Sequence, residues 1–237
     1  MASIGNFQDR TIYDFKNRLL GGGARSNLFE CELSFPTNAL MTGASPVNET
    51  DALTDSRFLI TAAALPASNL TTIPVPFRGR TLKIAGDRSF DPWTITVLND
   101  TTFRLRNAFE KWSNYINRFD DNSGVITPAS YQREIVVHQL SRGIATTSPS
   151  SDDTAPSTGA PIPILKSYKL YGCYPSSVSE IPLSYDVSDT IESFTVTFEV
   201  QWWDAFDGGG AKLFDTSEPN GTTPTTPNTG LISNTFL

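Results

Sequence analysis

The chain has 237 residues, of which 18 are basic and 25 acidic, giving a net charge of −7. This length fits one large domain or two small ones, and the acidity excludes a protein that holds nucleic acid by general phosphate neutralisation. One histidine, His138, and two cysteines, Cys31 and Cys173, exclude sites that need two histidines or a C-x-x-C pair. Neither a signal peptide nor a membrane anchor is expected, since no charged-then-apolar leader or long apolar run is present.

Residues 9–98 predict one helix and four strands. Apolar residues at helical spacing over 9–20 indicate a short N-terminal amphipathic helix that ends at the three glycines 21–23. Period-two alternation is typical of half-buried strands. It predicts strands at 29–35, 58–63, 79–86 and 92–98, the last two joined by a turn and paired with each other.

The strongest helical pattern spans residues 101–119. Asn99 or Asp100 provides a side chain suited to capping its first turn. A single apolar stripe follows at i, i+3, i+4 and i+7 spacing, formed by Leu105, Ala108, Phe109, Trp112, Tyr115, Ile116 and Phe119. We therefore expect one main amphipathic helix that lies on the core.

Three further strands are predicted at 131–140, 164–172 and 191–203. The last is unusually long, because strands commonly have about 5–6 residues. Its apolar side carries Phe194, Val196, Phe198, Val200 and Trp202, and its polar side carries Ser193, Thr195, Thr197, Glu199 and Gln201. The fold class predicted is mainly β, a single antiparallel barrel- or sandwich-like domain with one main helix and a short N-terminal helix.

Three stretches rich in Ser, Thr, Pro, Gly and Asn lack such patterns. We interpret 36–57 and 143–163 as polar loop insertions, and 204–237 as a C-terminal extension of a domain that covers 1–203. Their composition offers little apolar area to offset the entropy of ordering, unless a partner surface contributes.

No convincing catalytic or metal set can be assembled, so neither enzymatic activity nor a cofactor is expected. His138 near Ser141 and Glu134 is interpreted as a strand histidine with a local partner, because no nucleophile elbow such as G-x-S-x-G is present. The run 120–124 is interpreted as a helix-ending turn rather than a calcium loop. Aromatic residues of the last strands are expected in the core or at an interface, with a glycan platform as the alternative: Tyr168, Tyr171, Tyr174, Trp202 and Trp203.

Charge is unevenly distributed along the chain. Residues 58–118 contain eight basic and four acidic side chains, whereas 119–203 contain four basic and ten acidic ones. A basic middle between acidic flanks favours head-to-tail association of identical copies, although chance scatter over one surface is the alternative.

Several strings in the chain are specific enough to indicate a family. The most specific is KIAGDRSFDPWTITVLND at 83–100; the others are SNLFECEL at 26–33, IPVPFRGR at 73–80, FEKW at 109–112, LYGCYP at 170–175 and FTVTF at 194–198. Together they resemble the tail tube proteins of T4-like contractile-tailed bacteriophages, and the resemblance covers most of 7–35, 58–140 and 164–203. It implies a barrel-like subunit, related to the inner tubes of type VI secretion and contractile injection systems, with no enzymatic activity.

The resemblance also implies a set of partners and a location. Copies would form hexameric rings that stack into a hollow tube inside a contractile sheath. Baseplate and tail terminator proteins would bind the ends, and the tape measure protein and transiting double-stranded DNA would occupy the lumen without specific binding. The location implied is the virion, after assembly in the host bacterial cytoplasm.

Two sets of residues are predicted to serve such a tube. The residues expected to face the lumen are Ser193, Thr195, Thr197, Glu199 and Gln201. The alternating residues Phe194, Val196 and Phe198 are expected to pack on the helix. The segment 73–85, with Arg78, Arg80 and Lys83, is expected to form a hairpin arm that contacts the next ring. The alternatives are the inner tube of a phage-derived injection system and a monomeric β-sandwich binding module.

Overall fold

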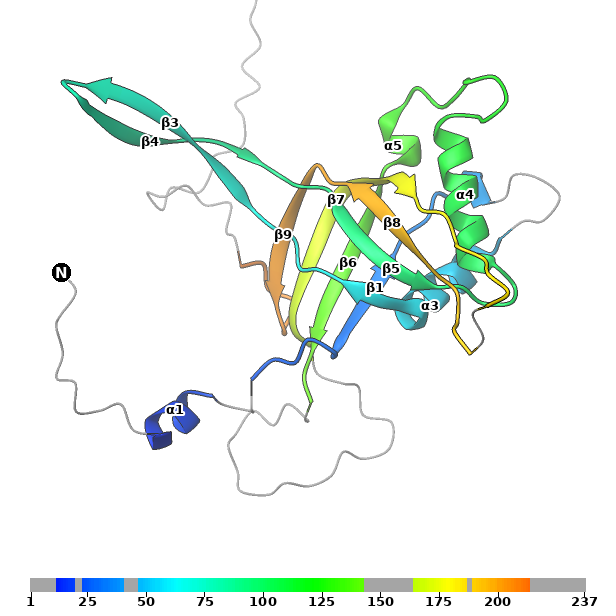
Figure 1. The fold of residues 1–237 in the computed structure, drawn as a ribbon, viewed down its shortest axis with the longest axis horizontal. Helices are drawn as coiled ribbons and strands as arrows, with labels where there is room; N and C mark the ends of the chain where they lie inside the picture. Colours follow the sequence, from blue (N-terminus) through cyan, green and yellow to red (C-terminus); the bar gives the residue numbers. More distant parts are fainter. Residues whose placement is uncertain (1–11, 20–22, 41–46, 143–163, 187–188, 214–237) are drawn as a thin grey trace, which may run out of the picture.

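The computed structural model describes residues 12–19, 23–40, 47–142, 164–186 and 189–213. Antiparallel strands dominate, with one long helix against the sheet and a hairpin that projects from it (Figure 1). The helices are α1 Ile12–Arg18, α2 Thr37–Leu40, α3 Glu49–Leu59, α4 Arg104–Ile116 and α5 Pro128–Tyr131. The strands are β1 Phe29–Leu33, β2 Ile60–Ala63, β3 Asn69–Phe77, β4 Arg80–Ser89, β5 Trp93–Leu98, β6 Arg133–Leu140, β7 Ile164–Val178, β8 Ser193–Glu199 and β9 Trp202–Asp207.

Strand β7 connects the two halves of the main sheet. The strand order is β1-β6-β7-β8-β5-β2, with β9 also paired to β7, and all neighbours are antiparallel. The first part of β7 pairs with β9 and the last part with β8. Gly172 lies at this change of partner with a φ of +64°, and a Cβ there would approach Gln201 Cγ to 2.5 Å. Glycine thus allows β7 to bend where its partner changes.

Helix α4 packs on the apolar side of this sheet. Its fully buried residues are Leu105, Ala108, Phe109 and Trp112, as its apolar stripe predicts. The ring of Phe109 lies 6.1 Å from that of Phe194 and 6.0 Å from that of Phe198. The Trp112 indole also donates to the Tyr131 carbonyl at 2.8 Å, so its one polar group is satisfied. The mainly β, antiparallel fold with one principal helix is therefore confirmed.

Asp100 caps α4, although the helix starts later than predicted. Its carboxylate accepts the amide of Arg104 at 3.1 Å, and Phe103 precedes the helix with a φ of +52°. Burial alone opposes ionisation of Asp100, but hydrogen bonds from the Thr102 hydroxyl and nearby backbone amides keep its pKa below the ordinary value. Phe119 lies beyond the helix and is exposed rather than part of the buried stripe.

The interpretation of 36–57 as a polar loop insertion was wrong in its described part. It contains α2 and most of α3, and it buries Ala39, Leu40 and Ala52 completely. The Asn48 side chain accepts the Thr50 amide at 3.1 Å and starts α3. These few small and apolar side chains suffice because the helices lie against α4 and β1.

Two strand predictions also need correction. The segment 79–86 does not pair with 92–98; β4 pairs with β3, and β5 lies between β2 and β8. The segment 191–203 is two strands, β8 and β9, separated by a bend at Val200 and Gln201. Because β9 buries Asp204 and Ala205, the folded domain extends past the predicted boundary at 203. The insertion 143–163 and most of the extension, 214–237, lie outside the described residues.

Candidate assembly surfaces

The polar and apolar sides of β8 face opposite directions. Phe194, Val196 and Phe198 are buried under α4, as predicted from their alternation. On the other side, Ser193, Thr195 and Gln201 are exposed, and Thr197 and Glu199 are half-buried. The sequence therefore correctly separates the two sides; whether the polar side lines a channel stays a prediction.

Neighbouring strands extend this polar side into a wall of hydroxyl groups. Thr96 and Thr94 of β5 lie opposite Thr195 and Thr197, and Ser177 of β7 pairs with Thr197 from the other side. The Thr94 and Thr197 hydroxyl oxygens are 3.1 Å apart. Such a surface carries hydrogen-bonding groups but no cation to hold a phosphate.

The hairpin of β3 and β4 is the most exposed element of the sheet system. All residues of its two strands are exposed except Gly86, which is half-buried. Arg78 and Gly79 form its two-residue turn with φ values of +45° and +79°, the combination that a type I′ turn requires. The predicted hairpin at 73–85 is thus confirmed and is longer than expected, whereas its contact with a neighbouring ring stays a prediction.

The hairpin has one apolar and one polar face. Cross-strand pairs place an apolar stripe on the first face, made by Ile73, Val75, Phe77, Leu82 and Ile84. Arg80 lies opposite Phe77 at the end of this stripe, whereas Lys83 lies opposite Pro74 on the other face. A two-stranded ribbon is at best marginally stable in water by itself. An exposed stripe on it indicates a surface that another chain covers.

Two prolines protect the outer edge of the hairpin. Pro74 and Pro76 occupy alternate positions of β3 and face Lys83 and Thr81 of β4. Proline has no amide hydrogen, and within sheets it is found where that hydrogen would point away from the neighbouring strand. The outer edge of β3 is therefore poor at adding another strand, and association through its apolar side chains is favoured instead.

The histidine does not form a reaction site. His138 Nδ1 lies 2.7 Å from the Ser167 hydroxyl, and Nε2 lies 3.9 Å from a Glu32 carboxylate oxygen. The partners therefore differ from the predicted Ser141 and Glu134, although the structural interpretation of a locally paired strand histidine holds. Glu32 itself forms an ion pair with Arg57.

The remaining candidate sites are also structural. Asp121 accepts both the amide and the hydroxyl of Ser123, which forms the predicted helix-ending turn and lowers the pKa of Asp121. Both cysteines are free and buried; burial raises the pKa of Cys31 and of Cys173 to about 12. Among the described residues, no group of three His, Cys, Asp or Glu side chains is placed to hold a metal ion.

The aromatic pair formed by half-buried Tyr171 and exposed Trp202 is covered on both sides. Tyr171 and Trp202 stack with ring centroids 3.9 Å apart, while Lys169 lies over the tyrosine at 5.0 Å and Lys212 over the tryptophan at 5.9 Å. A sugar ring would need an open aromatic face, and these two rings have both faces occupied. The glycan-platform alternative is therefore not supported.

An element that sequence reasoning missed completes the sheet edge. Ser56 of α3 is fully buried, and its hydroxyl oxygen accepts the Leu33 amide from the free side of β1. The signal available in the sequence was the run Asn48-Glu49-Thr50-Asp51, a capping residue followed by acidic side chains in a first turn.

None of the helices in the described part of the chain combines the length and apolar character that a membrane span requires.

The described surfaces expose a long apolar hairpin and a hydroxyl-rich strand face, which are typical of a structural subunit. A family model described as "Phage tail tube protein" matches residues 24–205, and the chain belongs to this family. It is accordingly a tail tube protein of a contractile phage tail, a structural virion component and not an enzyme.

Individual relatives agree with the family. The chain is 29% identical over 184 residues to the tail tube protein gp19 of Enterobacteria phage T4, covering 78% of this chain and 93% of that protein. It is 26% identical over 187 residues to the tail tube protein of Serratia phage KSP90, covering 78% and 91%.

Solved structures are more distant. A chain of the sheath-tube complex of an extracellular contractile injection system, PVC, in the extended state is 10% identical with a TM-score of 0.44, over 81% of this chain and 97% of that one. The Hcp1 protein from E. coli EAEC 042 is 10% identical with a TM-score of 0.39, over 78% and 95%.

Proposed function

We propose that copies of this chain form hexameric rings that stack into the hollow inner tube of the tail, the conduit for genomic DNA during ejection. The observation that carries the proposal is the hairpin β3–β4, whose apolar stripe is uncovered in a single copy. Burying apolar surface stabilises association by about 25 cal/mol per Å² removed from water, so the stripe favours packing on a neighbour. Membership of the tail tube family supplies the context.

The hydroxyl-rich side of β8 is proposed to line the channel. Ser193, Thr195, Thr197, Glu199 and Gln201 would form this wall, since their apolar neighbours in the strand are committed to the core. DNA is held chiefly through its phosphates by Lys and Arg, and this wall offers neither. The net charge of −7 would further oppose adhesion of the transiting duplex.

The hairpin is proposed to contact the next ring. Arg78 and Arg80 at its tip and Lys83 along it would face acidic groups of a copy in that ring. Outside the tube, the partner proposed is the tail sheath protein; at the ends, terminator and baseplate proteins; and inside, the tape measure protein. Assembly is proposed to take place in the host bacterial cytoplasm.

Electron microscopy of the purified full-length chain tests the proposal. Stacked rings with six-fold symmetry and an open centre are expected. Monodisperse single copies under all conditions, including with the purified sheath and baseplate proteins present, would overturn it. The double variant Arg78→Glu, Arg80→Glu is expected to shorten or abolish tubes; unchanged tube length would remove the hairpin from the ring contact.

A further inference from the structure

The hairpin does not by itself identify the surface of the next copy that it would contact. In the described chain, Arg78, Arg80 and Lys83 form no ion pair with a carboxylate; the Arg78 guanidinium lies over the Phe77 ring instead, 5.3 Å from its centroid. Residues 69–89 contain four basic side chains and one acidic one. A complementary surface must therefore combine exposed apolar side chains with acidic groups.

The connection between β7 and β8 meets this requirement. Its described residues, 179–186 and 189–192, are here called the acidic loop; they contain four acidic side chains and no basic one: Glu180, Asp186, Asp189 and Glu192. Among the described residues, Glu180, Asp186 and Asp189 form no ion pair. The loop is thus a locally negative surface whose charge is not neutralised by ion pairs within the described part of its chain.

The same loop exposes large apolar side chains. Leu183 is 80% exposed, Ile191 is 67% exposed and Tyr185 is fully exposed. Between the two arms of the loop lies a cavity of about 280 Å³, whose lining combines Ile181, Pro182, Leu183 and Ile191 with Ser184, Thr190, Glu192 and Ser193. Apolar side chains around a hollow, surrounded by carboxylates, match the apolar stripe and the flanking cations of the hairpin.

The ends of the loop are fixed to the body while its middle projects. The Ser179 and Thr195 backbones are hydrogen-bonded at 2.9 Å, and Arg106 donates to the Ser179 carbonyl at 2.5 Å. At the other end, the Asn99 side-chain amide donates to the Glu192 carboxylate at 2.9 Å. A loop anchored in this way loses less conformational entropy on binding than one free at both ends.

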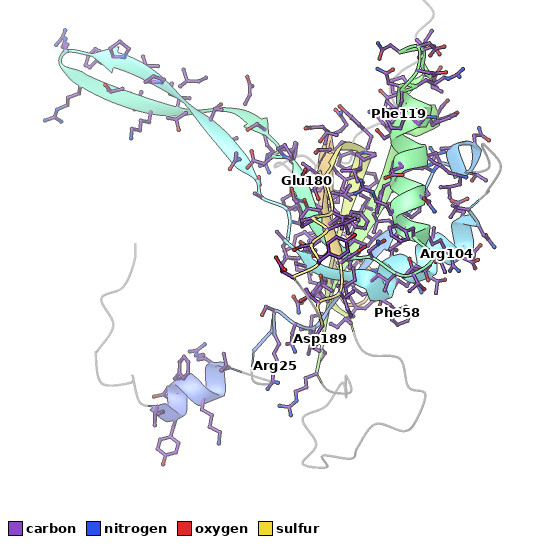
Figure 2. All side chains as sticks on the ribbon, turned by 45° about the vertical axis from the view of Figure 1, so that its right-hand side comes forward. Arg25, Phe58, Arg104, Phe119, Glu180 and Asp189 are labelled. Atoms are coloured by element: carbon purple, nitrogen blue, oxygen red, sulfur yellow. The ribbon has the colours of Figure 1, made fainter. Side chains whose placement is uncertain are left out.

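The two surfaces lie on opposite sides of the subunit. In Figure 1 the hairpin extends to the upper left, whereas the acidic loop runs beside α4 on the right. Figure 2 shows Asp189 on the lower part of the body of the molecule, away from the projecting hairpin. The hairpin cannot therefore reach the loop of its own chain, and complementary surfaces on opposite sides are the requirement for head-to-tail association.

We propose that the acidic loop of one copy receives the hairpin of a copy in the adjacent ring, with the apolar stripe against Leu183, Tyr185 and Ile191 and the hairpin cations beside Glu180 and Asp186. This assignment rests on the proposed function, in which rings stack. It explains why the hairpin is basic and the β7–β8 connection acidic in a chain whose charge is otherwise mixed.

Cross-linking between two single-cysteine variants tests the contact. Leu82→Cys lies near the hairpin tip in the apolar stripe, and Thr190→Cys lies in the acidic loop beside Ile191; both sites are exposed. The natural cysteines are buried and do not compete. Tubes assembled from an equal mixture are treated with a short bis-maleimide, and we expect a dimer that neither variant gives alone.

The matched control replaces Thr190→Cys by Ile126→Cys, at a side chain that is 95% exposed but outside the loop. No dimer is expected with this pair. Tubes that form normally without a Leu82–Thr190 cross-link would overturn the assignment and leave the proposed function intact. Failure of the unmodified chain to form rings would overturn the proposed function itself.

Charge reversal supplies an independent measurement. Two double variants are each expected to abolish stacking: Arg78→Glu with Arg80→Glu, and Glu180→Lys with Asp186→Lys. A chain that carries all four substitutions is expected to stack again. Asp51→Lys, an exposed reversal on α3, is the control and is expected to stack normally. A quadruple variant that stacks no better than either double variant would contradict the pairing. Circular dichroism confirms that each variant is folded.

Discussion

The hydroxyl oxygen of Ser56 accepts the backbone amide of Leu33 at 3.3 Å, in the position that a further strand would occupy beside β1. The same hydroxyl donates to the Leu53 carbonyl of its own helix at 2.7 Å. One side chain thus satisfies a buried backbone donor at the sheet edge and anchors α3 against it. Unpaired edges promote aggregation, and this helix covers one of them.

Ser56→Ala is therefore expected to lower the free energy of unfolding by about 1–3 kcal/mol, since the Leu33 amide would remain buried without an acceptor. Urea denaturation of the unassembled protein measures the change. Thr54→Ala, an exposed hydroxyl on the same helix that bonds to the Thr50 carbonyl, serves as the control and should change stability by at most about 0.5 kcal/mol. Equal effects of the two substitutions would contradict the role given to Ser56.

Asp100 is expected to make the stability of the domain depend on pH. Its pKa is lower in the folded state, so the stabilisation is present above its ordinary unfolded value near 3.8 and is lost as the pH falls through the folded value. Asp100→Ala should cost about 1 kcal/mol near neutral pH. Asp100→Asn keeps a capping acceptor and should reduce the loss of unfolding free energy at acidic pH, the acid limb of the stability curve. An acid limb identical to that of the unmodified protein would show that Asp100 does not contribute.

The two cysteines are expected to be inert in the folded protein. Burial raises both thiol pKa values to about 12, so the reactive thiolate is scarce near pH 8 and the sulfur atoms are shielded from reagents. An aromatic disulfide reagent should modify no thiol in native protein and two in strong urea. Rapid modification of either thiol under native conditions would contradict their placement in the core.

The sequence predicts elements whose patterns are strong and local. The stripe of α4 and the alternation of β8 are readable because each has a single buried face, such as that of Phe109 or Phe198. Helix α3 is missed because it buries only Ala52 and Ser56, too few for a periodic signal. Pairing is also missed: β4 and β5 are neighbours in sequence, but β3 is the partner of β4 because the Arg78–Gly79 turn closes a tighter hairpin.

The candidate assembly surfaces also differ in how far the sequence predicts them. Alternation places Thr195 and Thr197 away from the core without reference to any partner. No local pattern reveals that the acidic loop and the hairpin lie on opposite sides of the subunit, because this relationship depends on the whole sheet. The charge difference between sequence segments indicates association, and only the fold shows which surfaces carry it.

The two faces of β8 predict opposite responses to substitution. Phe198 contacts the rings of Trp93, Phe109 and Trp112, with centroid distances of 5.9–6.0 Å. Phe198→Ala is expected to cost about 3–5 kcal/mol of unfolding free energy through lost burial and the resulting cavity. Ser193→Ala, on the exposed face of the same strand, should change it by at most about 0.5 kcal/mol. Comparable losses at both positions, measured by urea denaturation, would be inconsistent with the assigned faces.

The channel assignment predicts a gain of DNA binding on introducing positive charge. Thr195→Lys with Thr197→Lys would place two cations per subunit on the proposed wall, which repeats around each ring. Each phosphate contact releases condensed counterions, so tubes of this variant should retain short duplex DNA at low salt and release it steeply as salt rises. Unmodified tubes should retain none under the same conditions, as measured by co-sedimentation of labelled duplex with tubes.

A control variant tests whether DNA retention depends on where the added lysines lie and not only on their charge. Thr50→Lys with Thr54→Lys adds the same charge on α3, away from the β8 face, and should bind DNA on the tube exterior, where nuclease can reach it. Duplex held by the Thr195→Lys, Thr197→Lys tubes should instead resist digestion, because the wall of the tube excludes the enzyme. If that duplex is digested as fast as duplex bound to the α3 variant, the hydroxyl-rich side of β8 does not line the channel.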